Sequence, residues 1–314
     1  MKFPVFDLHC DTASALLGKS WRQCGSLKNN GGHVDLERAS VLDSYAQCFA
    51  CCTTTLENAI SPVELFERQL ASVMREVENN RDCIAIAYNA SDVENNRKNG
   101  LMSAILSLEG PAAIGFDPGL LHDIYMVGYR MSTLGWNESN PLCGSHLTGE
   151  GLTEQGRQYM KTAQKLGMIV DMSHISDAAF WDAVNVTEKP LIASHSNSRS
   201  VFFHSRNLTD DMFRAICDTD GVVGINLYAN FLGENPDLDT VCDHIFHFLE
   251  LDPNASHICL GADLDGCDLL PDGFSGVQDY NKLSQRLLDR GLDQPTVMNI
   301  FWNNAFGVLK RCCM

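Results

Sequence analysis

Several short apolar segments of this chain end in side chains that can bind a metal ion or move a proton. The segments run up to His9, Glu109, His174, His195 and Asp263. Imidazole nitrogens and carboxylate oxygens are the ligands that zinc takes in catalytic sites. Histidines without a shared role would fall in helices and loops as well, so their place at the ends of apolar segments indicates a common site.

The first segment ends in the pair His9 and Asp11, which Cys10 separates. Successive residues of a strand point to opposite faces, so His9 and Asp11 point the same way and Cys10 points away. One nitrogen and one oxygen ligand at this spacing can hold an ion. By itself such a pair is more often a solvated loop pair, and only the four other strand ends make metal binding the favoured interpretation.

Glu109, His174 and His195 are the remaining candidate metal ligands. Glu109 follows an apolar run and could simply reach solvent, but its two oxygens also suit an acid that bridges two metal ions about 3.5–4 Å apart. His174 and His195 each follow a serine, and two neutral imidazoles suit a second metal position. The ordinary alternative for each histidine is a hydrogen-bonded place in the core.

Two carboxylates follow the last apolar segment, and one of them is the candidate general base. Asp263 ends the segment, and Asp265 lies two residues further on, before Gly266. Hydrolysis by an activated water needs a carboxylate that accepts the proton of that water. We expect Asp263 to be this base, and Asp265 either to cap the turn before Gly266 or to be the second candidate.

These side chains have to be positioned by strands that alternate with helices. Nine apolar runs rich in β-forming residues are candidate strands, and segments with helix-start signals separate them. The candidate strands are residues 5–9, 46–51, 83–87, 104–108, 131–134, 168–172, 191–194, 222–227 and 258–262.

Helix-start and helix-stop signals lie between these candidate strands. Ser61 and Ser91 each precede a glutamate by three residues, which is the spacing of a capping box, and a proline follows the first of them. Thr153 and Thr209 are further N-cap candidates, and Gly167 fits a helix end.

Alternating strands and helices predict a parallel sheet, and we expect an α/β fold of the (β/α)8 TIM-barrel type with the metal site at the C-terminal strand ends. Because a barrel needs eight strands, residues 83–87 should lie outside it. A doubly wound open sheet is the alternative, but its first turn would be rich in glycine, where this chain has His9-Cys-Asp-Thr12. Barrels of this size form one domain, so we expect a single metal-dependent hydrolase domain over residues 1–314.

The composition fits a globular enzyme and argues against several classes of partner. Hydrophobic residues make up 45% of the chain and charged residues 20%, which is enough for a core. A net charge of −17 repels nucleic acid and anionic membranes, so we expect neither as a partner. The sequence has no apolar run long enough for a signal peptide or a membrane span.

The 13 cysteines bear on the compartment. Disulfide frameworks belong to small secreted domains, whereas several of these cysteines lie inside apolar runs. We therefore expect buried thiols in a reducing compartment and a cytoplasmic protein. The sequence leaves a homodimer open.

As a set, the motifs resemble those of the renal (membrane) dipeptidase family of zinc peptidases, in the amidohydrolase superfamily. The similarity runs from Asp7 to near Leu309, and the motifs are specific together although none would suffice alone. They are His9-x-Asp11, Glu109-Gly, Ser173-His174, Ser194-His195-Ser196, His204-Ser-Arg206-Asn207 and Gly261-Ala-Asp263-Leu-Asp265-Gly266.

The resemblance implies two zinc ions per chain, with manganese or cobalt open as alternatives. It implies that Asp263 transfers protons and that Arg206 holds the substrate carboxylate, a bidentate task that suits a guanidinium. The metal ligands it implies are His9 and Asp11 for the first ion, Glu109 as the bridge, and His174 and His195 for the second ion.

The chain departs from the family pattern at one place in the expected substrate pocket. Many members carry a histidine near the end of the fourth barrel strand that contacts the scissile carbonyl, and this chain has Trp136 there, followed by Asn137. An indole donates one hydrogen bond and cannot act as a base. We expect Trp136 and Asn137 to contact the substrate and to alter how it sits.

These inferences predict a metallo-dipeptidase whose small-molecule substrate is a dipeptide. Two zinc ions would lower the pKa of a shared water toward about 7, and the bridging hydroxide would attack the amide carbonyl. A related amidohydrolase acting on N-acyl amino acids is the alternative, and a metal-free binding barrel is disfavoured because all the ligands are present. The other histidines are expected on the surface or in helices: His33, His122, His146, His244, His247 and His257.

Overall fold

The computed structural model describes residues 2–18, 25–53 and 60–313, and its centre is a sheet of parallel strands. The strands lie close to the nine runs expected from the sequence. They are β1 (Val5–Cys10), β2 (Tyr45–Cys52), β3 (Ile84–Ile86), β4 (Met102–Glu109), β5 (Tyr129–Thr133), β6 (Ile169–Asp171), β7 (Leu191–Ala193), β8 (Val222–Ile225) and β9 (Ile258–Leu260).

The sheet closes into a barrel of eight strands. β1 pairs with both β2 and β9, and β2 pairs directly with β4 from Ala46 opposite Ser103 to Cys52 opposite Glu109. Among the described residues β3 pairs with β4 alone, so it lies outside the closed barrel, as predicted for residues 83–87. The (β/α)8 prediction is confirmed, and the open doubly wound sheet is ruled out because the first and last strands are hydrogen-bonded neighbours.

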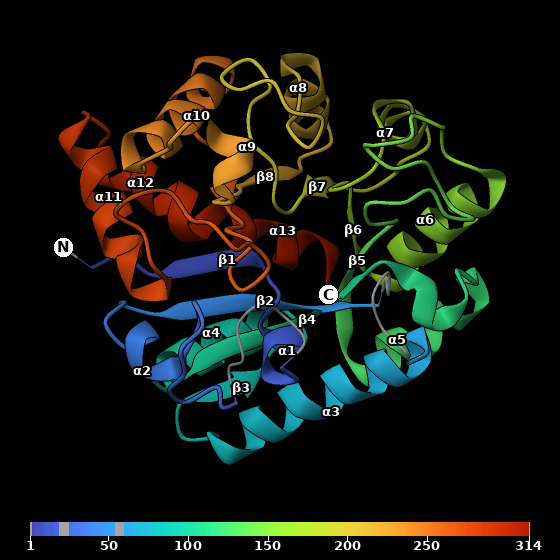
Figure 1. The fold of residues 1–314 in the computed structure, drawn as a ribbon, viewed down its shortest axis with the longest axis horizontal. Helices are drawn as coiled ribbons and strands as arrows, with labels where there is room; N and C mark the ends of the chain where they lie inside the picture. Colours follow the sequence, from blue (N-terminus) through green and yellow to red (C-terminus); the bar gives the residue numbers. More distant parts are fainter. Residues whose placement is uncertain (1, 19–24, 54–59, 314) are drawn as a thin grey trace.

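Helices surround the strands and cover their outer faces (Figure 1). The α-helices are α1 (Thr12–Leu16), α2 (Leu36–Ala39), α3 (Pro62–Asn79), α4 (Ala90–Lys98), α5 (Leu121–Val127), α6 (Glu154–Leu166), α7 (Asp177–Val184), α8 (Asp210–Asp218), α9 (Ala229–Leu232), α10 (Leu238–Leu251), α11 (Tyr280–Asp289), α12 (Gln294–Met298) and α13 (Asn304–Cys312). Shorter helical segments are η1 (Pro111–Ile114), η2 (Pro118–Leu120), η3 (Val277–Asp279) and the π-helical η4 (Asn299–Asn303).

Most of the helix-end predictions are confirmed. The hydroxyls of Ser61, Thr153 and Thr209 each accept a backbone N–H at the start of α3, α6 and α8, and Gly167 ends α6 in the left-handed conformation. The prediction for Ser91 is wrong by two residues. Asn89 caps α4 instead, because its side-chain oxygen accepts the N–H of Asp92, and asparagine is as good an N-cap as serine.

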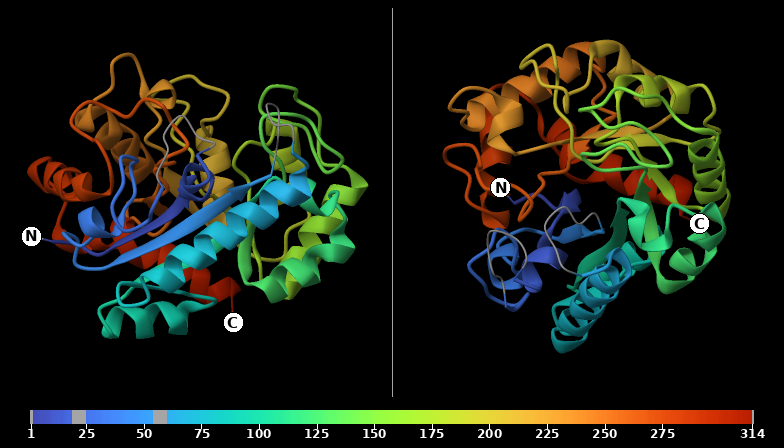
Figure 2. Two further views of the ribbon diagram at one scale, coloured as in Figure 1. Left: turned by 60° about the horizontal axis from the view of Figure 1, so that its bottom comes forward. Right: turned by 45° about the vertical axis from the view of Figure 1, so that its right-hand side comes forward.

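Two buried apolar layers hold the barrel together. The outer layer lies between strands and helices, whereas the interior layer draws residues from all eight barrel strands and from the C-terminal helical segment. In the left view of Figure 2, α13 lies on one side of the strands, opposite the loops that follow several of them. The interior layer includes Phe6, Ala46, Ile105, Met131, Ile169, Ile192, Val222 and Cys259 from the strands, and Trp302, Ala305 and Val308 from η4 and α13.

The cysteines of the described residues are thiols, as expected. All twelve of them are free, and most are buried. Cys48 and Cys51 on β2 have the spacing of a redox pair, but Cys48 faces the interior layer and Cys51 the outer one, so the strand itself separates them. No helix among the described residues is long and apolar enough to cross a membrane.

Candidate metal centre

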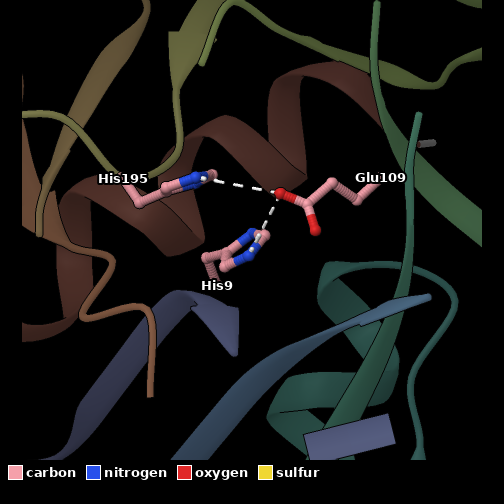
Figure 3. A group of neighbouring side chains, drawn as sticks. All are labelled: His9, Glu109 and His195. Atoms are coloured by element: carbon pink, nitrogen blue, oxygen red, sulfur yellow. Dashed lines mark ion pairs between the residues drawn. The ribbon is translucent and has the colours of Figure 1, made fainter. Parts of the chain in front are cut away.

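The barrel brings the five strand-end ligands predicted from the sequence into one cluster. His9 ends β1, Glu109 ends β4, and His195 follows β7; Figure 3 shows the Glu109 carboxylate pointing between the two imidazoles. All three side chains are almost fully buried. Glu109 Oε1 lies 3.6 Å from His9 Nε2 and 3.9 Å from His195 Nε2.

His174 completes the side of the cluster that holds His195. Its Nε2 atom lies 3.1 Å from Glu109 Oε1 and 2.8 Å from His195 Nε2. The two imidazoles therefore point their Nε2 atoms at the same place, and one carboxylate oxygen lies within 4 Å of all three histidines. An oxygen in this position can bridge ions held by different histidines.

The other side of the cluster is rich in carboxylates. His9 Nε2 lies 3.4 Å from Asp11 Oδ2 and 3.8 Å from Asp263 Oδ1. Two groups of ligand atoms are close enough to hold an ion, namely His9 with Glu109 and His195, and His9 with Asp11 and Asp263. His9 belongs to both groups, so the two candidate positions are adjacent.

Burial and mutual repulsion set the charges of this cluster. Loss of water raises the pKa of both Glu109 and Asp263, and the neighbouring carboxylates raise it further. Burial alone would lower the pKa of His9, but the charges of Glu109, Asp11 and Asp263 outweigh it and raise the pKa to about 10. Burial and the positive charges nearby hold the pKa of His174 and His195 well below the usual range, so both are neutral.

The donor set fits divalent metal ions. Both ring nitrogens of His9 are buried without a hydrogen bond, which is costly for an imidazole, and a metal ion in place of the Nε2 proton would give one of them a partner. The ligand atoms of each group lie within 4.8 Å of one another, and imidazoles and carboxylates are the ligands of zinc and related metals. The residues of this chain thus offer a site that a metal pair would satisfy.

Local backbone conformation turns two of these side chains into the barrel mouth. His174 and Asp263 are in the left-handed region, with φ of 74° and 61°. Such a conformation costs a residue with a side chain roughly 1–2 kcal/mol and is typical of functional positions. It is set by the turns that follow β6 and β9, so the alternation within those strands did not indicate it.

Two buried aspartates that the sequence analysis overlooked support the ligands from behind. Asp171 accepts the N–H groups of Ser173 and Ser194 at 3.0 and 2.9 Å and the hydroxyl of Ser194, whose oxygen lies 2.7 Å from His195 Nδ1. Because the Ser194 hydroxyl donates its hydrogen bond to Asp171, its oxygen can accept the Nδ1–H of His195. The Nε2 atom of His195 is then free to bind metal. Asp7 likewise accepts the N–H of His9.

A signal for these aspartates was present in the sequence. Asp7 and Asp171 each interrupt an apolar run that becomes a fully buried strand. A buried carboxylate needs partners, and a carboxylate two or three residues before a candidate ligand is a reasonable support for it.

Asp265, the second candidate base, uses both carboxylate oxygens in hydrogen bonds that hold neighbouring segments. One of its oxygens accepts the N–H of His33 at 2.6 Å and the other accepts the Thr12 hydroxyl at 2.7 Å. The expectation that His33 lies on the surface is wrong, because its ring is buried and accepts the N–H of Asp265. Asp263 instead reaches the cluster, where Asn226 donates to its Oδ2 atom at 3.2 Å.

Arg206 and Trp136 flank the cluster. Arg206 is 4% exposed, its Nε has no hydrogen-bond partner, and burial lowers its pKa to about 10, so it stays charged. One of its terminal nitrogens donates to the backbone oxygen of His195 at 3.4 Å. Trp136 is half-buried, with its ring 6.2 Å from that of His174.

The other histidines divide into expected and unexpected places. His244 and His247 lie on α10, as predicted, and His122 lies on α5. His146 is half-buried, and its ring contacts Asn137 and Ser205 beside His174. Burial lowers the pKa of His146 to about 4. Only the folding back of the loop after β5 brings it there.

A closed (β/α)8 barrel with histidines and carboxylates at its C-terminal mouth has a candidate metal centre at the face where such barrels carry their active sites. The family model described as membrane dipeptidase, peptidase family M19, matches residues 1–312. The chain belongs to this family of metallo-dipeptidases.

Individual relatives agree with the family assignment. A Schizosaccharomyces pombe protein described as an uncharacterized dipeptidase is 34% identical over 216 residues, which are 67% of this chain and about half, 53%, of that protein. The dipeptidase aclJ of Aspergillus oryzae is 30% identical over 294 residues, 88% of this chain and 69% of that protein. The crystal structure of the dipeptidase AC, a metallopeptidase of family M19, is similar to this structure with a TM-score of 0.89 at 26% sequence identity. The superposition covers 100% of this chain and 99% of the chain of that dipeptidase.

Proposed function

We propose that this protein is a dipeptidase that holds two zinc ions at the barrel mouth and hydrolyses the amide bond of dipeptides. The observation that carries the proposal is the Glu109 carboxylate oxygen within 4 Å of the Nε2 atoms of His9, His174 and His195. A single acid in contact with all three histidines suits a bridge between ions. When bound, such a pair of ions would supply an activated water at neutral pH and would polarise the scissile carbonyl.

The assignment of ligands follows the two sides of the cluster. His9 and Asp11 would hold one ion and His174 and His195 would hold the other, with Glu109 shared. Zinc is the metal best matched to this mixture of imidazole and carboxylate, and manganese and cobalt accept the same ligands.

Asp263 is the proton-transfer residue. Its Oδ1 atom lies 3.8 Å from His9 Nε2, in the group that His9 forms with Asp11, and its pKa is raised by burial and by Asp11. A carboxyl group with a raised pKa can take a proton from water and return it to the leaving amine near neutral pH. Asn226 fixes the other carboxylate oxygen and so sets its direction.

Arg206 binds the free carboxylate of the substrate. A buried guanidinium with an unpaired Nε–H at the edge of the cluster is prepared for an anion, and a carboxylate matches its planar pair of donors. This contact favours short substrates with a free C-terminus over internal peptide bonds of proteins.

A second substrate class is favoured by one observation. Trp136 stands beside His174, where many relatives are expected to have a histidine, and an indole leaves a differently shaped and less polar pocket. The same machinery would then act on N-acyl amino acids, which keep both the amide and the free carboxylate.

Three further expectations are part of the proposal. The chain acts as one catalytic domain over residues 1–314, and the free thiols of the described residues suit the cytoplasm. A homodimer stays open.

The test is hydrolysis of a defined substrate panel by protein of known metal content. Free dipeptides, the same dipeptides with an amidated C-terminus, and N-acetyl amino acids are compared at one zinc stoichiometry. We expect about two ions per chain and turnover of free dipeptides that exceeds that of the other two classes. Turnover of amidated dipeptides equal to that of free ones would refute the role of Arg206, and protein that binds only trace metal would refute the site.

A further inference from the structure

The side-chain oxygen of Asn137 is shared by two imidazoles. Asn137 Oδ1 lies 2.9 Å from His174 Nδ1 and 3.1 Å from His146 Nε2. The other nitrogen of His146 lies 2.8 Å from the Ser205 hydroxyl, and Ser205 precedes Arg206 in the chain. A continuous row of hydrogen-bonded side chains therefore leads from the Arg206 loop to His174.

One set of proton positions satisfies the row when His174 binds a metal ion through Nε2. A neutral His174 ring that points Nε2 at the ligand cluster carries its proton on Nδ1, where the carboxamide oxygen of Asn137 can accept it. In the same arrangement His146 donates its Nε2–H to that oxygen and accepts the Ser205 hydroxyl proton at Nδ1.

The backbone joins the same two segments. The N–H of His146 donates to the carbonyl oxygen of His174 at 2.8 Å, and Ser145 pairs with Ile175 as an antiparallel bridge. The Ser145 hydroxyl also donates to the backbone oxygen of Asn137 at 2.8 Å. The loop after β5 thus holds both the ring of His174 and its left-handed backbone.

We propose that Asn137 and His146 form a clamp that fixes the tautomer and direction of His174 as a metal ligand, and that Ser205 ties this clamp to the loop of Arg206. Asn137 is then a positioning residue and not the substrate contact expected from the sequence. The clamp rests on the proposed metal site but not on any substrate. His195 has a separate support through Ser194 and Asp171. A substitution in the clamp should therefore affect His174 and not His195.

The test measures metal affinity in the full chain, with cobalt or zinc alone and a chromophoric chelator as the competitor. Asn137→Leu removes the acceptor, and we expect the ion that His174 would hold to bind 10–100-fold less tightly, roughly the usual effect of losing such a support. Asn137→Asp keeps an oxygen at that place and should restore affinity to within a few-fold of the parent. The visible spectrum of the cobalt form should change in Asn137→Leu and not in Asn137→Asp.

A double-mutant comparison separates the clamp from two independent effects. His146→Ala should weaken metal binding less than Asn137→Leu, and the double variant should be no weaker than Asn137→Leu alone, because His146 acts through Asn137. Ser139→Ala is the matched control, since Ser139 bonds Thr148 and Glu150 within the same loop and does not touch His174. Its metal affinity should stay within twofold of the parent.

Three results would overturn the clamp. One is parental metal affinity in Asn137→Leu with a raised KM, which would make Asn137 a substrate contact. Another is additive losses in the double variant, and the third is an equal loss in Ser139→Ala, which would indicate general loosening of the loop. If Asn137→Leu does not fold, the comparison of Asn137→Asp, His146→Ala and Ser139→Ala still decides, because only His146→Ala should then weaken metal binding.

The two proposals fail separately. Parent protein that binds two ions and shows the clamp effect but cleaves no dipeptide would refute the proposed substrate and leave the clamp intact. Parent protein that cleaves dipeptides while Asn137→Leu binds metal normally would refute the clamp alone.

Discussion

Because Gly266 has no side chain, the carboxylates of Asp11 and Asp263 can lie next to its backbone. A Cβ atom added there would lie 2.1 Å from Asp11 Oδ2 and 2.4 Å from Asp263 Oδ1, and real Cβ contacts essentially never fall below 3.0 Å. Gly266→Ala therefore requires the two oxygens to retreat by about 0.9 and 0.6 Å. No left-handed φ is involved at this residue, so the effect of the substitution comes from the contact and not from backbone strain.

The expected result is loss of activity without loss of the fold. A displacement of about 1 Å in the groups around a reacting centre costs roughly 10²-fold in rate. Because Asp11 is a proposed ligand, the affinity for one ion should also fall by about 10-fold or more. The assay is kcat/KM on the best dipeptide of the panel, together with metal analysis and a thermal melt.

Gly31→Ala is the matched control, because a Cβ at Gly31 meets nothing within 4 Å and its φ is ordinary. Its activity and metal content should equal those of the parent. If Gly266→Ala binds two ions with parental affinity and keeps parental kcat/KM, the reasoning from this contact is wrong, and Asp11 and Asp263 do not stand where the structure puts them.

Four other outcomes follow from the site. Asp263→Asn should lower kcat by roughly 10²–10⁴ and keep both ions, whereas Glu109→Gln should lose metal; metal analysis with kinetics decides, and metal loss in Asp263→Asn would make it a ligand. Arg206→Ala should raise KM about tenfold or more with less change in kcat, since a charged hydrogen bond to substrate is lost; steady-state kinetics test this. Trp136→His should shift the preference across the substrate panel with metal content unchanged. An identical preference profile would show that Trp136 does not line the substrate pocket. In metal-free protein, burial raises the pKa of Glu109 from 4.5 to about 8 and of Asp263 from 3.8 to about 7, so the folded chain keeps protons that the unfolded chain releases. Above about pH 7 the histidines with lowered pKa, such as His174 and His195, are neutral in both states, so Glu109, Asp263 and His9 set the slope. The free energy of unfolding should therefore fall as the pH rises from about 7 to 8, and saturating zinc should remove this slope in urea melts.

The sequence by itself determined the fold class and the chemical character of the site. Its apolar runs alternate with capped helical segments, and that alternation is enough to predict a parallel barrel with β3 outside it. Histidines and carboxylates at the ends of those runs then had to meet, because the C-terminal ends of barrel strands share one mouth. Residue type and strand position carry this information, and both are local properties of the chain.

The tertiary structure alone decided how each ligand is held. The left-handed turns at His174 and Asp263, and the commitment of Asp265 to Thr12 and His33, depend on segments far apart in the sequence. His146 reaches Asn137 and His174 only because the loop after β5 folds back onto the loop after β6. Periodicity indicates which face a residue takes within an element, but turns and loops have no period, so the contacts that set ligand direction appear only when the chain has folded.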